Sequence, residues 1–561
     1  MTTFPKGWVH GLQFDNLRGD FFGGVTAAIV ALPLALAFGV ASGAGPITGL
    51  YGAMCVGFFA ALFGGTPAQV SGPTGPMTVV MASIFTSLVA DNPDTGLAMA
   101  FTVVMLGGLL QILMGILRLG KYITLMPYTV ISGFMSGVGV IILLIQIAPL
   151  FGHKGTAKVL DAFLGIPSVL SDINPLATGL GVLTLVIVFA APPRLNRILP
   201  APLIALVLGT LLSLLAIQVF PTSDIPRIGD IPSGLPTLHL PYFSWATLKD
   251  ILGYGLMLAV LGALDSLLTS LVADNITRTQ HNSNRELIGQ GIGNLVSGVL
   301  GGLPGAGATM RTVINVQAGG RTPLSGMIHA VMLTIIVLGA GTLTEPIPHA
   351  VLAGILIKVG IDIIDWGFLK RAHRLSTKGA GVMYLVLVLT VFVDLITAVV
   401  VGVFVANLLT IQSLTDLQAK DMRTVTQGDN EDWLMPEERS LLKAAKGRIL
   451  MFCLSGPMSF GAAKSISRRM AIVENYEILI LDLSNVPKLG VTALLAIETM
   501  LKDALAKKRQ VFLVGAAGQV ERRLQCLEVV QQLPPSHQVQ QRLEALQKAI
   551  TLLRDYAPQD A

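Results

Sequence analysis

The chain has 561 residues, of which 52% are hydrophobic and only 13% are charged, and its formal net charge is +5. A mean hydropathy of +0.70 excludes a water-soluble globular fold for most of the chain and indicates membrane-embedded helices. The three cysteines, Cys55, Cys453 and Cys526, are too scattered for a disulfide framework or a metal cluster, and lysines and arginines in loops explain the basic balance without nucleic acid.

The first part of the chain is a succession of apolar stretches. Residues 1–20 lack the basic start and short apolar core of a signal peptide, so we expect a cytoplasmic N-terminus there. From Phe21 to Ala90 there is no Asp, Glu, Lys or Arg. We predict a transmembrane domain at residues 21–412, with fourteen segments at 22–42, 48–66, 74–90, 98–117, 125–148, 176–191, 201–219, 251–273, 287–303, 309–319, 325–343, 349–364, 379–393 and 395–412.

The loop charges predict an orientation. Most basic loop residues fall on one side of the expected topology, and only Lys154, Lys158, Arg227 and Lys249 fall opposite. The positive-inside rule then places both termini in the cytoplasm and makes the chain a multi-pass protein of the plasma (inner) membrane, surrounded by lipid. The residues on the basic side are Arg18, Arg118, Lys121, Arg194, Arg197, Arg278, Arg285, Arg321, Lys370, Arg371, Arg374 and Lys378.

Seven segments precede the polar loop 220–250 and seven follow it, which divides the domain into repeats of about 21–220 and 250–412. An odd number of segments in each repeat inverts the second repeat relative to the first, as in many secondary transporters. The third segment of each repeat begins with an uncharged stretch broken by Gly and Pro, SGPTGPMT at 71–78 and GGLPGAGAT at 301–309. Helix starts at membrane depth attract anions, so the sequence predicts an anion site between them.

The chain changes character after Ile411. A polar linker at 413–447 is followed by strands at Ile449–Leu454, Ile478–Leu483 and Val511–Val514. Helices are expected at Val491–Lys507, from the third strand through Leu533, and at Val539–Leu553. Strands that alternate with helices predict a small cytoplasmic α/β domain at 448–555.

These motifs resemble the SulP-type anion transporters. The resemblance rests on ALPLALAFGVASG around Pro33, GLYG at 49–52, MPYTVISGF at 126–134, HNSNRELIGQGIGNLVSG at 281–298 and ATMRTVINVQAGGRTPLSG at 308–326. It implies a UraA-like membrane domain with core and gate parts and a cytoplasmic STAS domain. Within the family, GGTPAQVSGPTGPMTVV and LGALDSLLTSLVADNITRTQHNSN are most similar to the BicA-type sodium-dependent bicarbonate transporters.

The candidate anion site consists of Thr74, Gly75, Ala308, Thr309 and Arg311. A threonine hydroxyl beside free N–H groups suits a small oxyanion, and small residues allow it to approach the backbone. Alternatively, the threonines are N-caps and the small residues serve helix packing; the resemblance favours the anion. Arg311 supplies positive charge near the site, unless it reaches the cytoplasmic face or pairs with an acid.

The candidate cation site starts from Asp265, the carboxylate in the middle of the eighth segment, and Thr269 one turn later. With freed carbonyls near Gly305 to Gly307 they offer oxygen ligands, which sodium prefers. An ion pair with Arg311 and a proton-coupled carboxylate are the alternatives. The resemblance favours sodium and implies that Asp265, Thr269, Gly307 and Thr309 hold it; no other cofactor is expected.

The function expected from these features is secondary active transport, with sodium-dependent bicarbonate uptake by alternating access as the leading interpretation. A sulfate or dicarboxylate carrier coupled to protons or to anion exchange is the alternative. An enzyme is disfavoured because no nucleophile–base pair or metal-ligand cluster is evident, and an anion channel or signalling protein is a further possibility. In the tail, Gly490 stands where an acid usually precedes the phosphorylated residue, here Thr492, so a role in packing or dimerisation is favoured. The resemblance implies a homodimer joined through the STAS domain.

Overall fold

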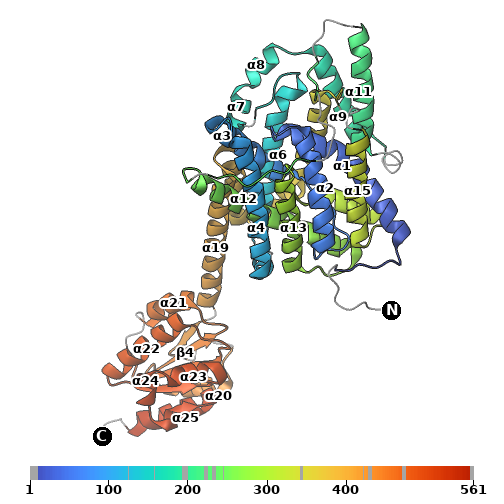
Figure 1. The fold of residues 1–561 in the computed structure, drawn as a ribbon. Coiled ribbons are helices and arrows are strands. Elements are labelled where there is room, and N and C mark those ends of the chain that lie inside the picture. Colours follow the sequence, from blue (N-terminus) through green and yellow to red (C-terminus); the bar gives the residue numbers. More distant parts are fainter. Residues whose placement is uncertain are drawn as a thin grey trace. The chain divides into compact units, whose positions relative to one another are not determined.

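The fold is taken from a computed structural model (Figure 1), which describes residues 10–123, 126–156, 158–192, 200–219, 225–229, 236–243, 245–340, 345–420, 422–427, 433–470 and 475–555. Residues 1–9 of the expected N-terminal segment, the loop residues Arg194 and Arg197, and parts of the loop 220–250 and the linker 413–447 lie outside this description. The chain forms two compact units, Met1–Ala406 and Asn407–Ala561, and each is described separately.

The first unit is helical, and each of the fourteen expected segments overlaps a helix. Short helices that the sequence did not predict lie between them: α5 Gly120–Ile123, α7 Val159–Leu164, α8 Ile166–Ser171 and α17 Trp366–Leu375. The fourteen are α1 Leu17–Ala41, α2 Pro46–Phe63, α3 Gly75–Asp91, α4 Gly96–Ile116, α6 Tyr128–Leu150, α9 Pro175–Ala190 and α11 Ala201–Val219, then α12 Leu248–Thr277, α13 Ser283–Val299, α14 Thr309–Gln317, α15 Pro323–Ala340, α16 His349–Ile363, α18 Thr377–Phe392 and α19 Leu395–Lys420.

The helices differ in their ability to cross a membrane alone. Among the described residues, seven are long and apolar enough, and the bent pair Val159–Ser171 and Pro175–Ala190 forms an eighth candidate. Others, such as α3 and α14, are short because a broken segment precedes them. The expected bounds 287–303 were wrong at both ends. The side chain of Asn282 accepts the N–H of Arg285 and starts α13 early, and the chain leaves the helix after Val299.

The two broken segments meet. Ser71–Gly72 (β1) and Ala306–Gly307 (β2) pair as short antiparallel strands, with Ser71 opposite Gly307 and Gly72 opposite Ala306. The expectation that these segments approach each other is confirmed, although the sequence predicted interrupted helices rather than strands. Each strand leads directly into a helix, α3 in the first half and α14 in the second. The strand pair, called the crossover below, therefore holds two helix starts side by side.

The close approach of the two broken segments requires glycine at Gly72, in the crossover, and at Gly305, just before it. A β-carbon on Gly305 would lie 2.5 Å from the carbonyl carbon of Gly72. Gly72 itself has a φ of 152°, and a β-carbon there would lie 2.7 Å from Nη1 of Arg311. The glycines that the sequence shows as helix breakers thus also permit close approach of two backbones.

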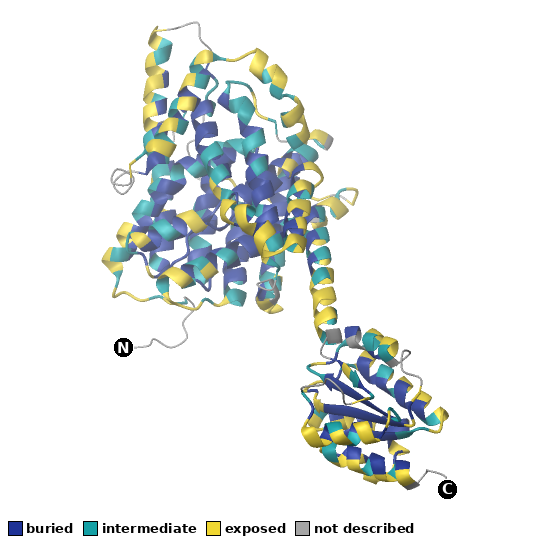
Figure 2. Cartoon of the chain, turned by 180° about the vertical axis from the view of Figure 1, so that it is seen from behind, coloured by how far each residue is buried: buried dark blue, intermediate teal, exposed yellow. Residues whose placement is uncertain are grey.

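Helix packing separates the first unit into two groups. In one, α13 packs against α2 and α4, α15 against α1 and α2, and α12 against α4. In the other, α6 packs against α16 and α18, and α9 against α11 and α16. Dark blue buried residues fill the interior of this unit in Figure 2. Large apolar side chains remain exposed on its outer faces, as expected for helices that contact lipid; examples are Leu109, Leu113, Phe189, Leu211, Val388 and Phe404.

The second unit is an α/β domain built on a five-stranded sheet of order β3-β4-β5-β6-β7, in which β3 is antiparallel and the others run parallel. The strands are β3 Arg423–Val425, β4 Ile449–Ser455, β5 Ile478–Asn485, β6 Gln510–Val514 and β7 Gln538–Val539. The helices are α20 Pro436–Ala444, α21 Phe460–Met470, α22 Val491–Ala506, α23 Gly518–Gln525, α24 Glu528–Gln531 and α25 Arg542–Asp555, with a 3-10 turn at Pro535–His537.

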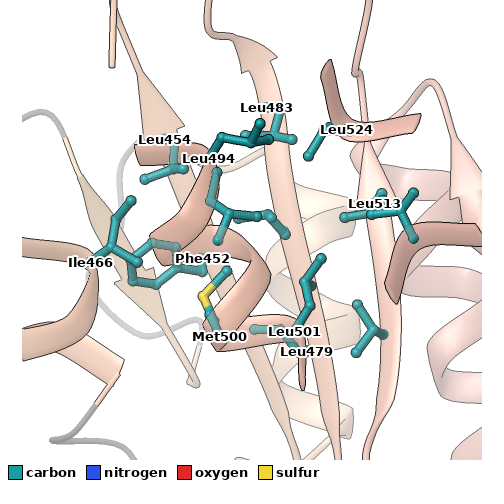
Figure 3. Packing of buried hydrophobic residues seen from close by; sticks show 14 of the residues in the cluster. Phe452, Leu454, Ile466, Leu479, Leu483, Leu494, Met500, Leu501, Leu513 and Leu524 are labelled. Carbon is teal, nitrogen blue, oxygen red and sulfur yellow. The ribbon is translucent and has the colours of Figure 1, made fainter. Parts of the chain in front are cut away.

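Alternation along β4 builds a core on both faces of this sheet. Leu450, Phe452 and Leu454 enter one hydrophobic cluster, part of which Figure 3 shows, whereas Ile449 and Met451 enter the other. The expected strands and the helix at Val491 are confirmed. Two expected helices were wrong in extent: the one through Leu533 is divided into α23 and α24, and the last begins at Arg542 because Val539 pairs with Val514 in the sheet.

The crossover predicts a steric effect of mutation. Gly305→Ala should lower the free energy of unfolding by about 1–3 kcal/mol, because the new methyl group meets backbone atoms of Gly72 that cannot move aside. Thermal unfolding of the purified protein in detergent measures the loss. The matched control is Gly381→Ala, where a β-carbon meets no heavy atom within 4 Å and a helix gains propensity. Equal thermal midpoints for both variants would contradict the proposed close approach.

Candidate functional site

Helix α12 brings the candidate cation ligands to the crossover. The Thr269 hydroxyl donates to the carbonyl oxygen of Gly307 at 2.9 Å and lies 2.8 Å from the Thr309 hydroxyl. These contacts join α12, β2 and the first residue of α14. Three of the four residues assigned to sodium therefore form one continuous group of oxygen atoms, and Asp265 lies one helical turn from it on α12.

Asp265 is buried and incompletely bonded. It is 8% exposed, and its Oδ2 has no hydrogen-bond partner among the described residues. It borders a cavity with room for about one water molecule. The rest of the lining is apolar and comes mainly from α6, α12 and Val399 of α19, with Phe134, Leu261 and Leu264 among its members. A buried carboxylate oxygen without a hydrogen-bond partner is a candidate ligand for a cation or a proton.

Not all backbone carbonyls of the second broken segment are free to bind a cation. The Gly305 carbonyl accepts a hydrogen bond from Asn294 Nδ2 at 3.0 Å, and the Gly305 N–H donates to Asn294 Oδ1 at 2.7 Å. Of the expected carbonyls near Gly305 to Gly307, that of Gly307 is the one beside Thr269. Ser266, one residue after Asp265, accepts the Gly307 N–H at 3.0 Å. Ser266 and Asn294 therefore fix the loop, and the sequence interpretation missed both.

Thr74 stands at the start of α3 and keeps a free hydroxyl. It is 8% exposed, and its Oγ1 has no hydrogen-bond partner among the described residues. Thr74 is the N-cap residue, but its side chain does not cap the helix. The hydroxyl lies within electrostatic reach of Asp265 without hydrogen-bond geometry. The alternative role as a capping threonine is therefore not seen for Thr74.

The remaining anion candidates differ in what they offer. Ala308 donates its N–H to the Val70 carbonyl at 2.9 Å, so that amide is already used. A β-carbon on Gly75 would lie 2.7 Å from Cδ1 of Ile363 and 2.9 Å from Cδ1 of Ile142, so these isoleucines of α16 and α6 cover it. Thr309 is exposed. The groups left for a ligand are the buried Thr74 hydroxyl, the Thr309 oxygen beside Thr269, and first-turn amides of α3 and α14.

Arg311 of the second repeat donates a hydrogen bond to the backbone of the first repeat. It is 2% exposed, and its Nη2 donates to the carbonyl of Pro73, the residue between β1 and Thr74. No ion pair between Arg311 and an acid is found among the described residues, which leaves its interaction with Asp265 at longer range. The guanidinium therefore satisfies a carbonyl freed by the break and places positive charge near the start of α3.

A line of polar residues on α13 lies behind the crossover. Glu286, Gln290 and Asn294 are 1%, 0% and 2% exposed, and they follow each other at intervals of four residues. Glu286 accepts from the Gly65 N–H at 2.9 Å and from Gln69 and Gln290 at 2.8 Å each. The interval of four was visible in the sequence and places all three on one helix face. The sequence motif thus contained a signal that the interpretation did not use.

In the second unit, Thr492 is exposed in the first turn of α22, close after the N-cap residue Gly490. Asp482 is 3% exposed and accepts the Ser484 hydroxyl at 2.5 Å. The Asp482–Ser484 pair therefore organises the end of β5. No described contact links Thr492 to an acid.

Known proteins share both the sequence and the domain order of this chain. Residues 17–386 match the sulfate permease family and residues 441–542 match the STAS domain. The chain is 53% identical to the bicarbonate transporter BicA of Synechocystis sp. over 98% of this chain and 97% of that protein. It is 52% identical to BicA of Picosynechococcus sp. over 96% of each chain.

Solved structures agree with the fold. The transmembrane domain of a cyanobacterial bicarbonate transporter BicA is 56% identical, with a TM-score of 0.66 over 70% of this chain and 100% of that one. Murine solute carrier 26 family member A9 is 20% identical, with a TM-score of 0.81 over 96% of this chain and 92% of that one. The two proteins therefore share a fold. The expected fold class, an α-helical membrane protein of fourteen segments in two inverted seven-segment repeats with a small α/β STAS domain, is confirmed. The chain is therefore a multi-pass integral membrane protein that belongs to the sulfate permease family and carries a C-terminal STAS domain.

Proposed function

We propose that this protein is a secondary active transporter that takes up bicarbonate together with sodium by alternating access. The observation that carries the proposal is the oxygen group at the crossover: Thr269, the Gly307 carbonyl and Thr309, with the unpartnered Oδ2 of Asp265 one turn away. Oxygen atoms of this kind suit a hard cation such as sodium. The identity of 53% to a bicarbonate transporter over nearly the whole chain supports the choice of anion.

Anion and cation share one residue in this proposal. Sodium is held by Asp265, Thr269, the Gly307 carbonyl and Thr309, and bicarbonate is held between the starts of α3 and α14 by Thr74, Thr309 and first-turn amides. Gly75 and Ala308 shape the floor of that site, and Arg311 adds positive potential. Because the two ions carry opposite charges and both lie beside Thr309, binding of one favours binding of the other, which is the basis of coupled transport.

Uptake into vesicles tests this function. Purified protein reconstituted in liposomes should accumulate radiolabelled bicarbonate when an inward sodium gradient is applied, and should lose this uptake when choline replaces sodium. Sulfate should not compete at equal concentration. Sodium-independent flux, or sulfate uptake that exceeds bicarbonate uptake, would favour the alternative carrier of sulfate or dicarboxylate.

The membrane and orientation follow from loop charge. We propose the plasma (inner) membrane as the location, with both termini in the cytoplasm. The orientation is supported by Arg278, Arg285, Arg321 and Arg371, which fall on the same side of the expected topology. Labelling of Cys526, which is exposed in the second unit, with an impermeant thiol reagent distinguishes the two orientations in sealed vesicles.

Removing the buried carboxylate should uncouple sodium. Asp265→Ala is expected to abolish sodium-stimulated uptake while the protein still inserts and folds, because the Oδ2 of Asp265 has no partner in the described part of the chain. The measurement is initial uptake against sodium concentration. Asp274→Asn is the matched control, since this acid, also on α12, pairs with His281 at 2.7 Å and should retain sodium stimulation. Normal sodium stimulation in the Asp265 variant would refute the cation site.

The two threonines should separate anion from cation effects. Thr74→Val should weaken apparent anion affinity by about 1–3 kcal/mol, because its hydroxyl has no hydrogen-bond partner among the described residues. Its effect on sodium affinity should be smaller than that of Thr309→Val. Thr309→Val should weaken both affinities, since it also breaks the contact to Thr269. Thr86→Val, whose hydroxyl bonds to its own helix at Ala82, is the control. Unchanged anion affinity in both site variants would rule out this site.

Dimerisation is assigned to the STAS domain. Val491 and Leu495, on one face of α22, are 63% and 52% exposed and offer an apolar surface to a second copy. Truncation after Asp416 should therefore reduce stability or dimer mass while leaving the ranking of competing anions unchanged. Oligomer mass and competition profiles are compared for both proteins in the same detergent. A changed substrate ranking with an intact dimer would contradict this division.

A further inference from the structure

The carboxylate of Glu286 lies behind the crossover and has no role in the site described above. It is 1% exposed, and three N–H donors converge on it: the Gly65 amide on Oε2, and the side-chain amides of Gln69 and Gln290 on Oε1. A buried charge with neutral donors is costly to maintain, and such residues in membrane proteins are usually functional.

Gln69 connects Glu286 to α12 through hydrogen bonds. Because its Nε2 donates to Glu286, its Oε1 is directed at the Ser270 hydroxyl, at 3.0 Å. Ser270 follows Thr269 directly, and its hydroxyl also contacts Thr66 at 2.7 Å. Gln69 in addition lies against Gly307, since a β-carbon there would be 2.4 Å from its Nε2. The orientation of this one amide therefore determines the dipole that faces both Ser270 and Gly307.

Gln290 connects Glu286 to β1 through hydrogen bonds. Its Nε2 donates to Glu286 Oε1 and, at 2.6 Å, to the Ser71 hydroxyl. Ser71 is opposite Gly307 in the crossover. One carboxylate is thus connected by single amides to α12 on one side and to the strand pair on the other.

We propose that Glu286 is a positioning residue for ion binding: its carboxylate fixes the orientation of the Gln69 and Gln290 amides and thereby the positions of Gly307 and of the Thr269–Thr309 oxygen group. This inference rests on the proposed function for its transport readout. A neutral amide at position 286 has one acceptor oxygen for three N–H donors. Its N–H end therefore faces either the Gly65 amide, which loses its acceptor, or Gln69 and Gln290, which must turn.

The test compares three full-length variants in liposomes. Glu286→Gln should raise the KM for sodium and for bicarbonate about tenfold, the effect of one misplaced hydrogen bond, with kcat little changed because every ligand remains. The double variant Glu286→Gln with Gln69→Glu should restore both KM values. The carboxylate now at position 69 accepts from the amide now at position 286 and still presents an oxygen to Ser270, and Gln290 can turn its Oε1, which has no partner among the described residues, toward the same amide. A residue that merely supports the fold would give no such rescue.

Asp20→Asn is the matched control. Asp20 is equally buried and accepts the N–H groups of Arg321 and Thr322 and the Thr322 hydroxyl, at 2.7, 3.0 and 2.7 Å. This variant should lose thermal stability while keeping both KM values. Unchanged KM values in Glu286→Gln, an equal rise in Asp20→Asn, or no rescue by the double variant would each overturn the proposal.

A second measurement keeps this inference separate from the choice of substrate. If the wild-type protein takes up no bicarbonate, the proposed function fails, and deuterium exchange decides the role of Glu286. The Gly307 and Ala308 amides, bonded to Ser266 and Val70, should exchange faster in Glu286→Gln and regain protection in the double variant. Unchanged protection in the single variant would refute the positioning role.

Discussion

The helical unit depends on the antiparallel pairing of β1 with β2. A chain that breaks a helix at membrane depth must find partners for the backbone groups that the break releases, because lipid provides none. Here each broken segment is the partner of the other, through Ser71 and Gly307, and side chains from α12, α13 and α14 bond the remaining groups. The two helix starts are therefore held together by the strand pairing and the Arg311–Pro73 bond, which run between the repeats, and the oxygens of Thr269, Gly307 and Thr309 lie beside this pairing.

The sequence predicted the helices and the two breaks because both depend on local features: runs of apolar residues, and glycine and proline inside them. It also led to Thr269, Gly307 and Thr309, which the fold brings together. It could not predict two-residue strands, which are too short to show a period of two. Nor did it identify Ser266 or Glu286, because their importance lies in partners such as Gly307 and Gln69 that are far away in the chain.

The buried charged groups nearest the crossover, Asp265, Glu286 and Arg311, differ in how they are bonded. Arg311 and Glu286 are bonded to backbone or amide groups, so their charge is stabilised by the protein itself. Asp265 differs, because one of its oxygens has no bond among the described residues and the carboxylate borders an otherwise apolar cavity. A protein that retains an incompletely solvated carboxylate at such a place gains stability when a cation arrives. The other two charges set the geometry around it.

The covering of Gly75 by Ile142 and Ile363 has a consequence for how the start of α3 is opened. These side chains belong to α6 and α16, which pack with each other, whereas Gly75 belongs to α3. The barrier at this point consists of methyl groups and contains no ion pair to break among the described residues. Its strength therefore scales with the apolar area in contact, is insensitive to ionic strength, and weakens on cooling as hydrophobic association does.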